Sequence, residues 1–204
     1  ETDNFYVLSA HKIIPPAMKA ILDAEEVMIN GFLCPGHVST IIGTHPYEFI
    51  PEEYGVPCVI AGFEPLDILQ GILSSVRQVQ SEKAEVEIAY RRVVHPQGNP
   101  VARKILDQVF RVCDASWRGL GVIPMSGLEI RDEFQNIDAR KHFDIHVKPS
   151  QEPKGCLCGE VLRGVKNPTD CVFFGKKCTP DDPIGPCMVS SEGTCAAYYK
   201  YGGI

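Results

Sequence analysis

The last fifty residues of this 204-residue chain are dense in cysteine and poor in large apolar side chains. Six of the nine cysteines lie there: Cys156, Cys158, Cys171, Cys178, Cys187 and Cys195. Four prolines interrupt the same segment. A segment of this composition buries too little apolar surface to offset the conformational entropy that folding removes. Cross-links must therefore shape it, through disulfides, a zinc ion or an iron–sulfur cluster.

The number and placement of the cysteines favour a metal over disulfides. Nine is an odd number, and Cys34, Cys58 and Cys113 lie far from the tail. Secreted disulfide scaffolds usually carry an even number of cysteines spread over a small chain. Here an ordinary α/β pattern precedes the cysteine-dense tail, so we expect a reducing, cytoplasmic compartment and a metal-bound tail.

Charge and hydropathy exclude two classes of partner. The net charge is −6 and there is no basic block, which argues against nucleic-acid binding. No apolar run approaches the roughly 18 residues that a membrane span needs, so no membrane is expected. No secretion leader is visible. The chain opens at Glu1 and soon enters an apolar run, which favours a fragment or a trimmed chain.

Short apolar runs alternate with amphipathic stretches over the first 110 residues. The expected strands are 5–9, 27–31, 57–63 and 85–94, and the expected helices are 18–26, 37–43, 64–80 and 99–112. Proline lies near each helix start, where its missing N–H costs nothing. The helix over 64–80 is the clearest, because its apolar residues fall on one face: Leu66, Leu69, Leu73, Val76 and Val79. Asn99 is a good N-cap.

This alternation predicts an α/β fold with a parallel sheet and right-handed crossovers. We expect an α/β domain over 1–84 and an α/β segment over 85–150. A small, irregular cysteine-rich domain is expected over 151–204. One more strand is expected within 119–130, and a linker runs from Lys148 to Gly155.

Reactive groups follow three of the expected strands, and parallel sheets bind ligands beyond such strand ends. The groups are Ser9, His11 and Lys12, then Cys34 and His37, then Glu64 and Asp67. A thiol before a helix N-terminus, with a histidine three residues on, has two influences that lower its pKa. Each group also has a structural interpretation: a buried thiol, a solvated cation, or a carboxylate facing a helix dipole.

The spacing of the tail cysteines narrows the choice of metal. Paired C-x₂-C knuckles, typical of a zinc ribbon, are missing from the sequence. Irregular spacing suits a cubane held by thiolates from a wrapping loop, although spacing cannot choose four ligands from six. If Cys156 and Cys158 are locally extended, their sulfurs project to the same side. One would then lie beside any cluster that the other holds, as a thiol available for redox chemistry.

Long sequence strings resemble the HypD family, whose members help to build the iron centre of nickel–iron hydrogenases. The strings are INGFLCPGHVSTIIG, CVIAGFEPLDIL, RRVVHPQGNPVA, CGEVLRGVKNPTDCVFFGKKCTP and GPCMVSSEGTCAAYYKY. The resemblance implies two similar α/β domains and a small C-terminal domain with a [4Fe–4S] cluster. It also implies partners, a HypC-like protein in the complex and a HypE-like protein that delivers cyanide, and a transient Fe(CN)₂CO unit.

The resemblance assigns roles to residues of this chain. The family ligand pattern C-x₁₄-C-x₆-C-x₁₆-C selects the metal ligands Cys156, Cys171, Cys178 and Cys195. The redox thiol pair of the family falls on Cys158 and Cys187. The family's cleft turns fall on Cys34–His37 and on Gly62–Pro65, which places Cys34, His37 and Glu64 at a partner surface.

One family feature has no counterpart here. The N-terminal motifs, including the cysteine taken to hold the assembling iron, are missing from the chain. We therefore expect that the N-terminal third of the family's length is missing, and that 85–148 normally pairs with it. The expected function is a scaffold and electron donor rather than a turnover enzyme. The rivals are a cluster-dependent thiol/disulfide reductase and a zinc-stabilised interaction module.

Overall fold

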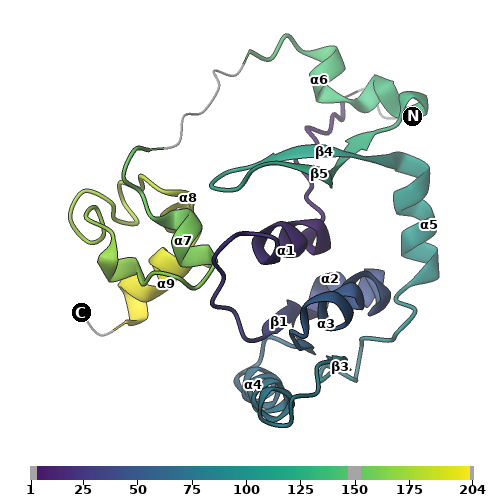
Figure 1. The fold of residues 1–204 in the computed structure, drawn as a ribbon. Helices are drawn as coiled ribbons and strands as arrows, with labels where there is room; N and C mark the ends of the chain where they lie inside the picture. The colour runs from purple at the N-terminus through teal and green to yellow at the C-terminus, as the bar shows by residue number, and fades with distance from the viewer. Residues whose placement is uncertain (1–3, 147–152, 203–204) are drawn as a thin grey trace. The chain divides into compact units, whose positions relative to one another are not determined.

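The computed structural model describes residues 4–146 and 153–202. The chain divides into two compact units, each described here by itself (Figure 1). The sheet unit comprises Ile29–Arg111 and Glu129–Gln135. The cysteine unit comprises Glu1–Met28, Val112–Leu128 and Asn136–Ile204. No helix in the described ranges is both long enough and apolar enough to cross a membrane.

The sheet unit is built on three parallel strands in the order β1-β2-β3. Its elements are β1 (Phe32–Pro35), α2 (Gly36–Ile42), η1 (His45–Tyr47), α3 (Phe49–Tyr54), β2 (Cys58–Ala61), α4 (Pro65–Gln80), β3 (Val86–Ile88) and α5 (Pro100–Val109). Every residue of β2 is buried, as expected for a central parallel strand. Figure 1 shows α2 and α3 on one side of the sheet and α4 on the other. The α/β fold class is confirmed.

The cysteine unit has less regular structure. Its elements are α1 (Ile14–Leu22), α6 (Ala139–His142), α7 (Cys158–Leu162), η3 (Pro168–Asp170), α8 (Pro186–Val189) and α9 (Thr194–Tyr201). The strands β4 (Phe110–Trp117) and β5 (Gly121–Ile130) form a two-stranded sheet, followed by η2 (Asp132–Ile137). A connection as short as 118–120 requires this pair to be an antiparallel hairpin. The hairpin and η2 are shared between the two units.

Two strands expected from the sequence differ from those in the structure. The strand expected over 27–31 begins instead at Phe32, because the Met28 amide donates to the Arg163 carbonyl oxygen rather than to the sheet. Within the described parts of the chain, the run 5–9 makes a single parallel bridge, between Val7 and Asp138. The expected linker from Lys148 begins outside the described residues.

The helix that begins at Pro100 ends earlier than its periodicity predicts. Asn99 caps its start, and the Asn99 side chain accepts from the Ala102 amide as expected. The helix ends at Val109, whose carbonyl accepts from the Arg131 amide. The alternating apolar residues that follow then pair as β4. The strand expected within 119–130 is confirmed as β5.

Helix α4 is present where expected, but its apolar face points outward. Leu66, Leu69 and Leu73 are 75%, 62% and 48% exposed. Gly71 faces the sheet instead, where a Cβ atom would lie 2.9 Å from the Ala61 Cβ and 3.1 Å from the Leu33 Cδ2. The helix therefore approaches β2 closely through a residue without a side chain, and its leucine stripe is left on the surface of the sheet unit.

Candidate functional site

All six tail cysteines line one small cavity in the cysteine unit. They reach it from separate elements, since Cys158 opens α7, Cys187 lies in α8 and Cys195 lies in α9. The space at the centre is about 20 Å³, room for roughly one water molecule, so the side chains pack closely around it. Tertiary folding therefore gathers thiols that are up to 39 residues apart in sequence.

The packing around the cysteines is apolar but small. Phe174, Met188 and Ala196 are buried with Cys178, and Ile184 packs against them. The Phe174 ring makes edge contacts with Tyr198 and Tyr199, at centroid distances of 6.0 and 6.1 Å. A cluster of this size gives little hydrophobic stabilisation. The expectation that the tail cannot fold on its apolar residues alone agrees with this small core.

Hydrogen bonds connect thiols inside the cavity. Cys187 is hydrogen-bonded to both Cys158 and Cys195. These two hydrogen bonds are the largest causes that raise the pKa of the Cys187 thiol, and burial is the next. Burial is the largest cause that raises the pKa of Cys156. The bond with Cys187 lowers the pKa of Cys195. The Ile184 amide donates a hydrogen bond to the Cys178 sulfur at 3.3 Å.

Two glycines leave room for the cysteines. A Cβ atom on Gly185 would lie 2.5 Å from the Cys156 sulfur. One on Gly193 would overlap the Cys187 carbonyl oxygen. Both residues have negative φ angles, −90° and −69°, so the need is for space and not for backbone freedom.

The extended conformation considered for Cys156 and Cys158 is not present. Leu157 between them has φ −97° and ψ 24°, and Cys158 begins a helix. The two sulfurs nevertheless line the same cavity. The turn at Leu157, rather than the alternation of an extended strand, brings them together.

The donor chemistry of the cavity fits an iron–sulfur cluster. All nine cysteines of the chain are described, and none of them forms a disulfide. Thiolates are the ligands of [4Fe–4S] clusters, and six of them surround one space. No three His, Cys, Asp or Glu side chains among residues 4–146 and 153–202 are arranged around a single ion. A cubane is larger than one water, so holding it requires the cysteines to move apart while their sulfurs still point into the cavity.

A second group of expected residues lies at the carboxyl ends of β1 and β2 in the sheet unit. His37 and Glu64 are exposed, and the His37 ring packs on Phe63 at a centroid distance of 4.3 Å. A Cβ atom on Gly36 would overlap the Ala61 carbonyl oxygen, so this glycine lets the two strand ends approach closely. The CPGH and GFEP turns are therefore neighbours.

Cys34 differs from the expectation. It is only 2% exposed, and its bond with Cys58, followed by burial, raises the pKa of its thiol. The expected lowering of this pKa is wrong, because the thiol points into the core and His37 lies on the surface. At this strand end His37 and Glu64 are exposed, and Cys34 is buried.

His37, Phe63, Glu64 and Arg92 form an exposed surface at the carboxyl ends of β1 and β2, called here the strand-end surface. Arg92 was not expected there from the sequence. Its guanidinium donates to both oxygens of Asp67, at 2.8 and 2.6 Å, and forms an ion pair with Glu64 at 3.4 Å. It also lies over the Tyr90 ring, 4.6 Å from the centroid. The bonds from Arg92 hold the pKa of the Asp67 carboxyl below its usual value. Asp67 thus orients a cation rather than only facing a helix dipole.

The remaining expected group belongs to the cysteine unit. The Ser9 hydroxyl donates to the Leu128 carbonyl at 2.6 Å, and its oxygen lies 3.0 Å from the His11 Nδ1. The Lys12 ammonium lies 6.0 Å from the Trp117 ring centroid. These contacts attach the segment to the β4–β5 hairpin.

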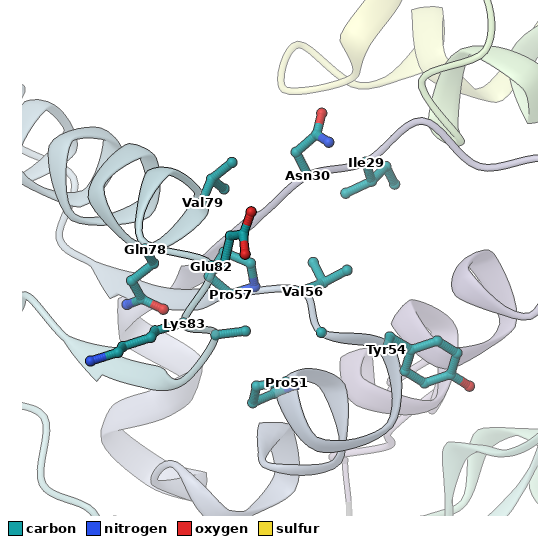
Figure 2. Close-up of a pocket in the computed structure, with 12 residues that line it drawn as sticks. Ile29, Asn30, Pro51, Tyr54, Val56, Pro57, Gln78, Val79, Glu82 and Lys83 are labelled. Carbon is teal, nitrogen blue, oxygen red and sulfur yellow. The ribbon is translucent and has the colours of Figure 1, made fainter.

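A pocket of about 560 Å³ lies at the amino ends of the parallel strands (Figure 2). Asn30, Val56 and Pro57 precede β1 and β2, while Gln78 lies in the last turn of α4 and Glu82 follows that helix. Residues of mixed chemistry line it, and no motif in the sequence marks it. Ligands of parallel sheets usually bind at the opposite ends of the strands, so the pocket is not assigned to the site.

Comparison with known proteins identifies the family. The profile of the HypD family, described as "Hydrogenase formation hypA family", matches residues 1–202. The chain is 50% identical to the hydrogenase maturation factor HypD of Cupriavidus necator, covering 99% of this chain and 55% of that protein. It is 46% identical to a putative hydrogenase expression/formation protein of Methanocaldococcus jannaschii, covering 98% and 56%. The chain thus spans about half the length of these relatives. It belongs to the HypD family.

Proposed function

We propose that this chain is the cluster-bearing part of a hydrogenase maturation factor. It would act as a scaffold and electron donor while the Fe(CN)₂CO centre of a nickel–iron hydrogenase is assembled. The observation that carries the proposal is the convergence of six thiols on one cavity in a member of this family. The relatives are named for hydrogenase maturation or for hydrogenase expression and formation, which supports the same role.

Four of the cavity cysteines would hold a [4Fe–4S] cluster: Cys156, Cys171, Cys178 and Cys195. When bound, such a cluster supplies or accepts single electrons. The apolar packing of Phe174 and Met188 would exclude water from the thiolates. The Ile184 amide, which donates to the Cys178 sulfur, would help to fix the position of that ligand.

Cys158 and Cys187 would form the redox thiol pair. They are hydrogen-bonded to one another and line the same cavity as the four ligands. Oxidation of the pair forms one sulfur–sulfur bond and releases two protons and two electrons. Cys187 is also hydrogen-bonded to Cys195, one of the four proposed ligands, which supports contact between the cluster site and the pair.

The strand-end surface would bind other maturation proteins. His37, Phe63 and Glu64 are exposed there, and the leucine stripe of α4 begins two residues later at Leu66. We infer that a HypC-like partner docks on this surface and that a HypE-like partner delivers cyanide. The Fe(CN)₂CO unit is the cargo of the complex, and its binding requires parts of the longer protein.

Metal analysis of the chain purified without oxygen tests the proposal. We expect four irons and four sulfides per chain from a [4Fe–4S] cluster, and loss of both in Cys171→Ala. Cys113→Ala is the matched control, since Cys113 lies outside the cavity. One zinc without sulfide would instead establish the zinc-stabilised interaction module.

The reductase alternative is favoured by one observation: Cys158 and Cys187 are hydrogen-bonded to each other and do not form a disulfide. It predicts catalytic turnover of a protein disulfide. Anaerobic assays with a thioredoxin-like substrate would compare the wild-type chain with Cys158→Ser. Turnover that depends on Cys158 would replace the scaffold proposal, and stoichiometric reaction without turnover would support it.

A further inference from the structure

A second pocket lies between the β4–β5 turn and the start of α7, within the cysteine unit. Its volume is about 200 Å³. Its walls include Arg118, Gly119, Cys156, Cys158, Glu160 and Pro186. It adjoins the six-cysteine cavity, because Cys156 and Cys158 line both spaces.

The turn residue Gly119 brings the backbone next to one sulfur. Its φ is +88°, which favours glycine. A Cβ atom there would lie 3.8 Å from the Cys158 sulfur and 3.3 Å from the Pro186 Cγ. The hairpin turn therefore forms a wall of the pocket directly beside Cys158.

The two members of the expected redox pair differ in access to this pocket. Cys158, which is 5% exposed, lines both this pocket and the inner cavity, whereas Cys187 lines the inner cavity and is not among the residues that line this pocket. Cys187 is hydrogen-bonded to Cys158 from inside. A reactant in the outer pocket thus meets Cys158 and the proposed cluster ligand Cys156 before Cys187, and of these two Cys158 is the one hydrogen-bonded to Cys187.

The pocket carries one side chain of each charge. Arg118 is exposed and Glu160 is half-buried. Neither side chain has a hydrogen bond or an ion pair with another residue in the described ranges 4–146 and 153–202. A ligand that offers both a carboxylate and an ammonium group would satisfy the two charges together.

We propose that this pocket binds a small disulfide of the amino-acid type, with Arg118 on its carboxylate and Glu160 on its ammonium, and that Cys158 exchanges with it. The inference rests on the proposed redox role of the Cys158–Cys187 pair. It adds to that role the attacking sulfur and the chemistry of the reactant.

The exchange balances in two steps. The Cys158 sulfur attacks one sulfur of the external disulfide, forming a mixed disulfide and releasing the first external thiol, which takes up the Cys158 proton. The Cys187 sulfur then attacks the Cys158 sulfur, forming the internal disulfide and releasing the second external thiol with the Cys187 proton. The chain loses two electrons and the external disulfide gains them.

Four disulfide probes separate the two charges. Cystine carries both groups, dithiodiglycolate only carboxylates, cystamine only ammonium groups, and hydroxyethyl disulfide neither. The anaerobically purified chain with Cys187→Ser traps the mixed disulfide, and peptide mass mapping locates it. We expect the adduct on Cys158 and the fastest reaction with cystine.

Charge variants made in the trapping background test the two contacts. Arg118→Gln should slow cystine and dithiodiglycolate by roughly three- to tenfold and leave hydroxyethyl disulfide unchanged. Glu160→Gln should slow cystine and cystamine by a similar factor. Arg118→Lys keeps the charge and should retain most of the rate, which separates a charge effect from a loss of structure.

Two results would overturn the inference. The first is that neither Arg118→Gln nor Glu160→Gln alters the rate with any probe. The second is that Cys158→Ser forms an adduct on Cys187 as fast as the trapping variant Cys187→Ser forms one on Cys158. The proposed function fails on a different measurement. If exchange follows the expected charge pattern but the chain holds no iron and sulfide, only the proposed role in assembly is lost.

Discussion

Asp67 shows how one carboxylate can organise a strand end. Its side chain is 11% exposed and accepts two hydrogen bonds from Arg92. A Cβ atom on Gly62 would overlap the Asp67 carboxylate, so the carboxylate also packs on the turn that carries Glu64. The sequence shows the acidic residue but not its partner, which is 25 residues away.

This pair predicts a pH dependence of stability. Arg92 lowers the pKa of Asp67 in the folded chain relative to its usual value of 3.8. The contribution of the Asp67–Arg92 pair to the free energy of unfolding is therefore complete at neutral pH. It is lost as the pH falls through the pKa of Asp67 in the folded chain. In denaturant titrations down to about pH 3, Asp67→Asn should reduce the acid-induced loss of unfolding free energy. Asp107→Asn, at an exposed position, should leave the acid-induced loss of unfolding free energy unchanged. If the unfolding free energy falls with pH equally steeply in the wild type and in Asp67→Asn, the Asp67–Arg92 pair is not its cause.

Cys34 predicts a difference in thiol reactivity. Burial and the bond with Cys58 raise the pKa of its thiol, and the thiolate is the reactive form. We expect iodoacetamide to modify half-buried Cys113 in the native chain well before Cys34, and to modify both after denaturation. Peptide mass mapping measures this. Equal native rates would mean that Cys34 is accessible at the strand-end surface.

At the scale of elements, helix α4 packs one side on the sheet and leaves the other on the surface. The amphipathic pattern of its sequence does not predict which side is which. Helical periodicity locates the apolar stripe but not what covers it. Gly71 and the buried Gln78 lie on the side of α4 that packs on the three-stranded sheet, while the leucines point away from it. The Gln78 side chain donates to Glu87 at 3.1 Å and accepts from the Glu85 amide at 3.0 Å, so polar contacts also fasten this side.

The two sides of α4 should respond differently to substitution. Leu69→Gln should change the unfolding free energy by less than about 0.5 kcal/mol, because the side chain is already exposed. Gly71→Leu should cost on the order of 1–3 kcal/mol, because it overpacks the contact with Ala61. Urea denaturation measures both. Binding of a HypC-like partner should weaken only with Leu69→Gln; a large destabilisation by Leu69→Gln would contradict the outward orientation.

At the scale of the whole molecule, stability should be unevenly distributed. The sheet unit has a central strand with consecutive buried residues, whereas the cysteine unit depends on a small apolar cluster and its thiols. Metal binding in small domains contributes on the order of 10 kcal/mol, comparable to the about 5–15 kcal/mol total stability of a domain. Loss of a cluster should therefore unfold the tail.

Cys171→Ala tests this distribution. Hydrogen exchange should become fast across 156–201 and stay unchanged in β1, β2 and β3. Cys113→Ala is the control and should leave the tail protected. A tail that remains protected in Cys171→Ala would show that packing alone folds it.

The sequence alone determined the class of the sheet unit and the identity of its helices. Proline positions, the Asn99 cap and the periodicity over 64–80 are local signals, and helices follow local signals. Cysteine density and long matching strings also indicated the kind of site. These signals need no knowledge of which segments meet in space.

Tertiary structure decided the rest. It placed β1 at Phe32 because Met28 bonds elsewhere, turned the leucines of α4 outward because Gly71 fits the sheet, and buried Cys34 against Cys58. It also gathered six thiols around one cavity and set Gly119 beside Cys158. Contacts between distant residues determine these features, and their free energies depend on packing and burial that no local pattern encodes.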